Sequence, residues 1–154
     1  PGLQYRRLFR EFFGLFCGPA HPLFGRRDLA LADLAGQSSV SFVTDQMNDA
    51  LRAVTMMRSE ARLDDRVVGT SANLEEVRRM IVAGLGIGPL PLHVVKEDVE
   101  MGRLWRLPPY RTPAAIDVHV AWNPRTRANR AEQAMLERLL ERIESTPMTE
   151  RIYQ

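Results

Sequence analysis

The sequence predicts an α/β fold built on an open sheet with mostly parallel strands. Short apolar runs of the kind that form buried strands alternate along the chain with amphipathic segments of helical period. Most of the helical segments end at glycine, and the connections between segments are short. This alternation is typical of open parallel sheets, in which ligands bind at the carboxyl ends of the strands.

Six segments have the length and composition of strands. They are short, apolar and rich in β-branched or aromatic residues: 11–17, 39–43, 66–69, 86–90, 104–107 and 116–122. We expect the middle four to form the central sheet. The first and last should join a second, incomplete sheet, because a stiff proline-rich connector at 108–113 precedes the last one.

Five segments have the apolar period of helices: 29–36, 44–62, 73–84, 92–102 and 128–143. The clearest is 73–84, where Asn73 and Glu76 have the spacing of a capping box and Gly84 follows the last turn. The tail after Pro147 is expected to be loose.

Composition limits the function classes. The 154 residues have room for one domain or two small lobes, and the net charge is only +2. The arginines are spread among acidic residues, whereas nucleic-acid-binding modules cluster them on one face, so we expect no DNA binding by these residues themselves. Cys17 is the only cysteine, which excludes an internal disulfide and fits a reducing compartment. No signal peptide or membrane-spanning run is visible, and we expect a cytoplasmic protein.

No catalytic, metal or cofactor site can be assembled from the motifs. The glycines of AGLGIG at 83–88 follow a helix and open a strand, whereas a dinucleotide fingerprint follows a strand and opens a helix. Cys17 and His21 have no third partner nearby in sequence and no metal-ligand spacing. We therefore expect neither an enzyme nor a cofactor, with Cys17 a buried structural thiol.

The candidate ligand site is the start of the helix at 73–84. Thr70, Ser71, Ala72 and Asn73 bring two hydroxyls, an amide and several backbone N–H groups to a helix N-terminus, which favours carboxylate or phosphate. Simple helix capping explains the same residues equally well. Thr44 opens a second helix in the same way. Arg10, before an apolar strand, is either a solvated flank or a carboxylate clamp.

Several segments together resemble the effector-binding region of LysR-type transcription regulators. These are an apolar strand followed by HPLFGRRDLALADLAG, then SANLEEVRRMIVAGLGIGPLP, then MGRLWRLP. The resemblance covers about Leu8 to Ile143, and the order and spacing of the segments make it specific. It departs from the family at GPLP, where the family has an aliphatic strand.

The resemblance implies an open sheet like that of type 2 periplasmic binding proteins, with one complete lobe and part of a second. Residues 1–23 would belong to the first lobe, 24–110 would form the second, and 111–154 would return to the first. It implies a small-molecule effector, often a carboxylate metabolite, held by Arg10, Thr44 and 70–73. It also implies homo-oligomers, and DNA binding only through an N-terminal helix-turn-helix that these residues do not contain.

Two alternatives remain at this point: a periplasmic solute-binding protein of a transporter, and a small α/β enzyme, which the lack of a catalytic set disfavours. A partial first lobe also predicts self-association. It would leave apolar surface around Phe12, Phe13, Phe16 and the final helix, and such surface tends to be covered by a partner.

Overall fold

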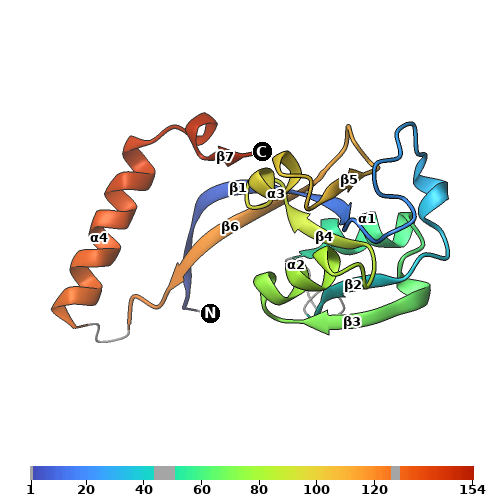
Figure 1. Cartoon of the computed structure of the whole chain (residues 1–154). Coiled ribbons are helices and arrows are strands. Elements are labelled where there is room, and N and C mark those ends of the chain that lie inside the picture. Colours follow the sequence, from blue (N-terminus) through green and yellow to red (C-terminus); the bar gives the residue numbers. More distant parts are fainter. Residues whose placement is uncertain (1, 44–50, 126–128) are drawn as a thin grey trace. The chain divides into compact units, whose positions relative to one another are not determined.

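The computed structural model describes residues 2–43, 51–125 and 129–154 (Figure 1). The chain divides into two compact units. Unit 1 comprises Pro1–Glu11 and Asp117–Tyr153, and unit 2 comprises Phe12–Ile116 together with Gln154.

Unit 2 is built around the second half of the long strand β1 (Gln4–Cys17). This half pairs antiparallel with β4 (Gly88–Pro91) on one side and with β5 (Trp105–Leu107) on the other. A second ladder pairs β2 (Ser39–Phe42) parallel with β3 (Val67–Ser71). The two ladders meet at Ile87: its N–H donates to the carbonyl oxygen of Ser38, just before β2, and its carbonyl oxygen accepts from the N–H of Val40 in β2.

The predicted division of the strands between two sheets was partly wrong. Segments 11–17 and 116–122 share a sheet as expected, since β6 (Ala114–Trp122) pairs with β1. Strands β4 and β5, which were expected beside β2 and β3, instead lie on either side of β1, whose apolar run enters the core of unit 2. The reason is burial, since Leu15, Phe16 and Cys17 are almost fully buried and such a strand needs a backbone partner on each side. The parallel arrangement holds for β2 and β3, whereas β4 and β5 run antiparallel to β1.

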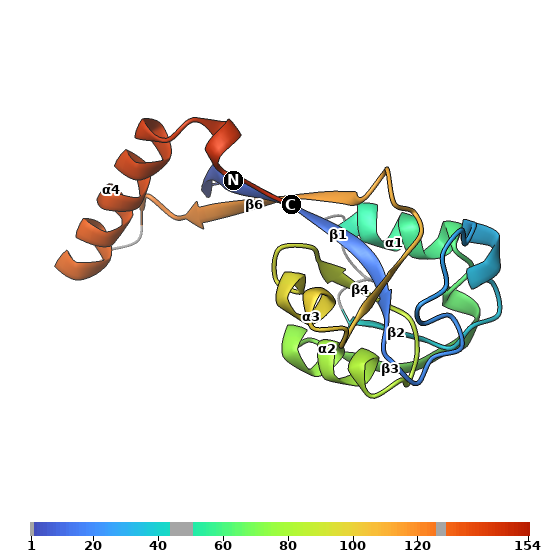
Figure 2. The same ribbon diagram turned by 45° about the horizontal axis from the view of Figure 1, so that its top comes forward.

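The described helices of unit 2 lie in the predicted segments, except the 3-10 helix at 64–66, which was not predicted. They are η1 (Leu31–Leu34), α1 (Arg52–Glu60), η4 (Asp64–Arg66), α2 (Leu74–Val82) and α3 (Lys96–Glu100). The expected start of the second helix at Thr44 lies outside the described residues. Figures 1 and 2 show α2 and α3 side by side, and a buried carboxylate joins them. Asp98 of α3 accepts bonds from Arg78 of α2 at 2.9 Å and from Arg103 at 2.5 Å.

The glycines of AGLGIG serve the backbone turn and the packing of α2, in agreement with the expectation that they do not form a nucleotide-binding motif. Gly84 ends α2 with a φ of +81°, a conformation that favours glycine. A Cβ on Gly88 would lie 2.7 Å from side-chain atoms of Ile81 and Val40. Helix α2 therefore packs on the sheet as closely as it does only because position 88 has no side chain.

Unit 1 contains the first part of β1, most of β6 (Ala114–Trp122), α4 (Arg130–Ser145), η5 (Met148–Glu150) and β7 (Ile152–Tyr153). Strand β6 pairs with β1. Helix α4 begins with a capping box between Asn129 and Glu132. None of its described residues is buried.

The tail after Pro147 is not loose, contrary to expectation. Strand β7 pairs parallel with β1, with Ile152 opposite Arg10. The Arg151 guanidinium donates from Nη1 to the carbonyl oxygens of Arg7 and Leu8, both at 2.7 Å. Hydrogen bonds from the Arg151 side chain to two backbone carbonyls of β1 thus help to hold the tail in place. No local sequence pattern indicates this contact, because Arg151 and β1 are at opposite ends of the chain.

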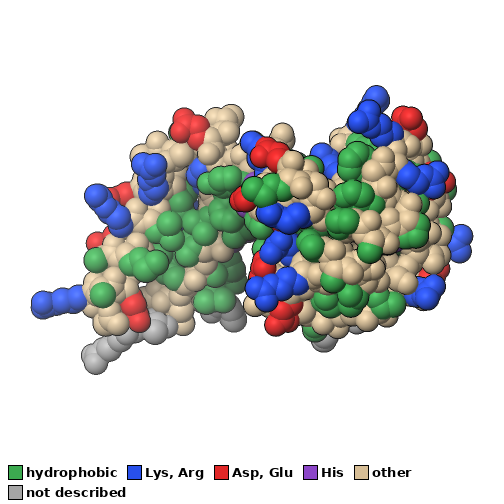
Figure 3. Space-filling model, viewed as in Figure 1, with side chains coloured by type: hydrophobic (Ala, Val, Ile, Leu, Met, Phe, Trp, Pro, Cys, Tyr) green, Lys and Arg blue, Asp and Glu red, His purple; other side chains and the backbone are tan. Residues whose placement is uncertain are grey.

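Apolar surface is exposed on unit 1 (Figure 3), at Met135 of the final helix as expected, but not at Phe13 and Phe16. Phe13 and Phe16 are buried, 5% and 1% exposed, because they belong to the core of unit 2. The exposed apolar side chains of unit 1 are Leu3, Tyr5, Met135, Ile152 and Tyr153. Among the residues described, no helix is both long and apolar enough to cross a membrane.

Candidate functional site

The carboxyl ends of β2 and β3 lie side by side, because the two strands are parallel and in register. Ser41 is opposite Thr70, and Phe42 is opposite Ser71. The loop 70–73 then leads from β3 into α2. This is the position at which open α/β sheets bind ligands. Thr44 follows Phe42 by two residues in sequence but lies outside the described residues.

The polar groups of loop 70–73 hold the loop in shape. The Asn73 side-chain oxygen accepts from the backbone N–H of Glu75 at 2.8 Å and of Glu76 at 3.3 Å. The Ser71 hydroxyl accepts from the Asn73 N–H at 3.0 Å and donates to the Glu76 carboxylate. Asn73 is therefore confirmed as the N-cap of α2, but the predicted box with Glu76 does not form, because Glu76 turns to Ser71 instead.

Charge at the start of α2 is close to balanced. The first turn contains Glu75 and Glu76, which offset the positive end of the helix dipole. Hydrogen bonds and ion pairs from Arg78, and then Arg79, lower the pKa of Glu75 to about 2. Thr70, Ala72 and Asn73 are exposed and Ser71 is half-buried. The loop thus presents hydroxyl and peptide groups rather than a strong positive charge.

Arg10 belongs to unit 1, and its guanidinium is already paired. It donates from Nε and Nη2 to the two carboxylate oxygens of Asp117, both at 2.8 Å. Arg7 adds a third bond to Asp117 at 3.2 Å. The hydrogen bond from Arg10 and the nearby positive charges lower the pKa of Asp117 to about 2, so the ion pair persists over the working pH range. A ligand carboxylate would have to compete with Asp117 for the Arg10 guanidinium.

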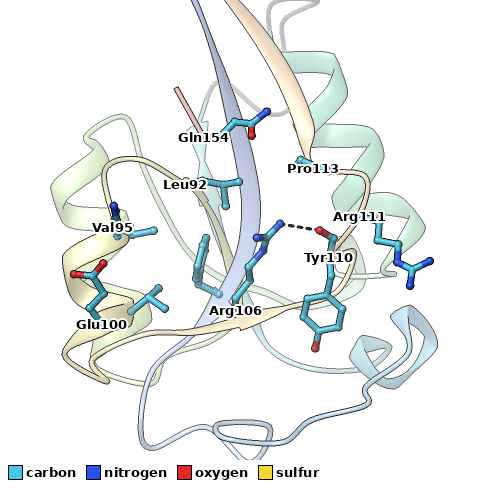
Figure 4. A pocket seen from close by; sticks show the side chains of 11 residues that line it. Leu92, Val95, Glu100, Arg106, Tyr110, Arg111, Pro113 and Gln154 are labelled. Atoms are coloured by element: carbon cyan, nitrogen blue, oxygen red, sulfur yellow. Dashed lines mark hydrogen bonds between the residues drawn. The ribbon is translucent and has the colours of Figure 1, made fainter. Parts of the chain in front are cut away.

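A pocket of about 540 Å³ in unit 2 was missed by the sequence analysis (Figure 4). Its floor is apolar, with Phe16, Leu92 and Val95 among its residues, and Arg106 and Tyr110 contribute to its wall. The signal in the sequence was the mixture of aromatic and basic residues in LWRLPPYR at 104–111. That signal is weak, since such residues are also common on solvated strand edges.

Comparisons with known proteins find matches over most of the chain. A family model described as the LysR substrate binding domain matches residues 1–144. The HTH-type transcriptional activator BauR of Pseudomonas aeruginosa is 30% identical over 145 residues, which is 92% of this chain and 43% of BauR. The chain thus spans less than half the length of this curated relative.

Two solved regulatory or effector-binding domains have the same fold. The regulatory domain of HypT from Salmonella typhimurium superposes with a TM-score of 0.69 at 16% identity, over 95% of this chain and 68% of that one. The effector-binding domain of QuiR, solved in complex with shikimate, superposes with a TM-score of 0.68 at 14% identity, over 94% and 66%. The transporter alternative is set aside on the family match. The chain belongs to the LysR substrate-binding domain family, the effector-binding region of LysR-type transcription regulators.

Proposed function

We propose that this chain senses a small molecule on behalf of a LysR-type transcription regulator, with the effector held by loop 70–73. The observation that carries the proposal is the alignment of Ser41 with Thr70 and of Phe42 with Ser71. It puts a polar loop and a helix N-terminus at the carboxyl ends of two parallel strands, where folds of this type hold ligands.

We propose residues from both units as effector contacts. Unit 2 corresponds to the second lobe, and unit 1 to part of the first. Thr70, Ser71, Ala72 and Asn73 contact the effector from the second lobe. Arg10 contributes a guanidinium if the effector carries a carboxylate that competes with Asp117. The complex of QuiR with shikimate supports a small organic effector, and we propose a carboxylate metabolite here.

The role is regulatory rather than catalytic. Cys17, the only thiol of the chain, is fully buried, and burial raises its pKa to about 12. A thiol in that state is a poor nucleophile at neutral pH. His21 is also buried, and its Nδ1 accepts from the Leu23 N–H at 3.2 Å. Both groups therefore serve the fold.

The partners follow from the family. We propose a cytoplasmic protein that binds DNA through a helix-turn-helix outside these residues and works as a homo-oligomer. The exposed apolar side chains of unit 1 support association, because contiguous apolar surface tends to be covered by a partner.

The test is a ligand screen on the protein encoded by the complete gene. Small carboxylates, aromatic acids and amino acids are screened by thermal shift, and the best ligand is then measured by calorimetry. Ser71→Ala should weaken binding by about fivefold, the effect of losing one neutral hydrogen bond worth about 1 kcal/mol. Ser145→Ala, on exposed α4, is the matched control and should bind as the wild type does. Equal affinities of the Ser71→Ala variant and the wild type would place the effector elsewhere.

A further inference from the structure

The 540 Å³ pocket of unit 2 has the size and lining of a small-molecule site. Sites for small ligands commonly have volumes of roughly 300–1,000 Å³ and combine an apolar floor with a few polar groups. Here the apolar side is formed by Phe16 on β1 together with Leu92, Val95 and Val99 on and beside α3. The polar side is formed by β5 and the loop after it, 108–113.

The polar lining is predominantly cationic. Lys96, Arg106 and Arg111 carry three positive charges, whereas Glu100 carries the one negative side chain among the described lining residues. A cavity with this balance attracts an anion. The apolar floor beside the cations selects an anion with an apolar body over a bare inorganic ion.

Arg106 has the geometry of a carboxylate receptor. Its Nη2 donates to the carbonyl oxygen of Tyr110 at 3.1 Å, and this bond holds the guanidinium in place (Figure 4). Its Nε–H is buried and has no acceptor among the described residues. A buried donor without an acceptor destabilises the protein, and a carboxylate beside the guanidinium edge would satisfy it with a charge-assisted bond.

We propose that this pocket is a second ligand site, for a monocarboxylate with a compact apolar body such as an aromatic ring. The carboxylate pairs with Arg106, with Lys96 and Arg111 adding long-range attraction, and the ring lies on Phe16 and Val99. The pocket shares no residue with loop 70–73, so a failure of one proposed site leaves the other proposal intact.

The test uses benzoate on the 154-residue chain, followed by ¹H–¹⁵N spectra that include the arginine Nε–H signals. Benzoate should shift the Arg106 Nε–H signal and the amides of Phe16 and Val99 in a saturable manner. Benzamide, which has the same ring but no charge, should bind roughly tenfold more weakly or worse, because it cannot form the charged pair.

Two variants distinguish binding in the pocket from nonspecific attraction of benzoate to arginines. Arg106→Gln should weaken benzoate binding by roughly tenfold or more, whereas Arg52→Gln, an exposed arginine on α1, should leave it unchanged. If Arg106→Gln does not fold, the comparison of benzoate with benzamide on the wild type still tests whether binding requires the carboxylate. The proposal is overturned if benzoate produces no saturable shift up to its solubility limit, if benzamide binds equally well, or if Arg106→Gln keeps the wild-type affinity.

Discussion

Arg151→Ala should release the C-terminal strand β7 from β1 while the rest of unit 1 stays folded. The wild-type guanidinium donates three hydrogen bonds. One goes to Thr146 within the tail at 3.0 Å, and two go from Nη1 to the carbonyls of Arg7 and Leu8. Of these three guanidinium bonds, only the two from Nη1 join the tail to β1.

The magnitude follows from these two bonds. A hydrogen bond from a charged donor contributes roughly 1.5–3 kcal/mol when shielded from water. Arg151 is only half-buried, so we discount each bond to about 1 kcal/mol, or about 2 kcal/mol for the pair. Since 1.36 kcal/mol is a factor of ten, the tail of the variant should open about 30-fold more often.

Amide hydrogen exchange at Arg10 measures this opening directly. The Arg10 N–H donates to the Arg151 carbonyl at 2.9 Å, so it exchanges only when β7 detaches. We expect exchange at Arg10 to be about 30-fold faster in Arg151→Ala. Arg138→Ala on α4, which removes one exposed ion pair with Glu141, is the matched control and should exchange at the wild-type rate. An Arg10 rate in Arg151→Ala within about threefold of the wild type would refute the anchoring role.

Three further outcomes are expected. Gly88→Ala should lower the free energy of unfolding by about 1–3 kcal/mol, because its methyl group would overlap Ile81, and urea unfolding measures this. Asp98→Ala should lower it by about 2 kcal/mol, since it leaves two partly exposed arginines without their carboxylate; a loss under about 0.5 kcal/mol would contradict this. Burial lowers the pKa of His21 below its ordinary 6.5, so the unfolded chain takes up the proton first as pH falls. The free energy of unfolding should therefore fall below about pH 6.5, and less so in His21→Asn, as urea midpoints measured from pH 7.5 to 5 would show.

Local patterns were sufficient for most elements of unit 2. Helix α2 has strong apolar periodicity, an Asn73 cap and a terminal glycine, and all three signals are local in sequence. The pairing of β1 could not be obtained in this way. Its buried half looks like any apolar strand, and its neighbours β4 and β5 are about 75 to 90 residues away along the chain.

The site was partly predictable for the same reason. Loop 70–73 was found from its capping residues, which are contiguous. The ion pair between Arg10 and Asp117 was not predicted, because the two residues are 107 positions apart and no local sequence pattern connects them. The Arg106 pocket combines β1, α3 and the loop after β5, so its lining exists only in the folded chain. The Asn129–Glu132 capping box, by contrast, is visible in the sequence and was overlooked.

Amide shift mapping with the effector tests whether the ligand binds at the ends of β2 and β3. The protein encoded by the complete gene is titrated with the ligand that the thermal-shift screen identifies. We expect the largest shifts on Ser71, Ala72 and Asn73 and on Ser41 and Phe42 at the end of β2. Large shifts confined to other segments, with these five amides unmoved at saturation, would contradict the claim that the chain senses its effector at the ends of β2 and β3.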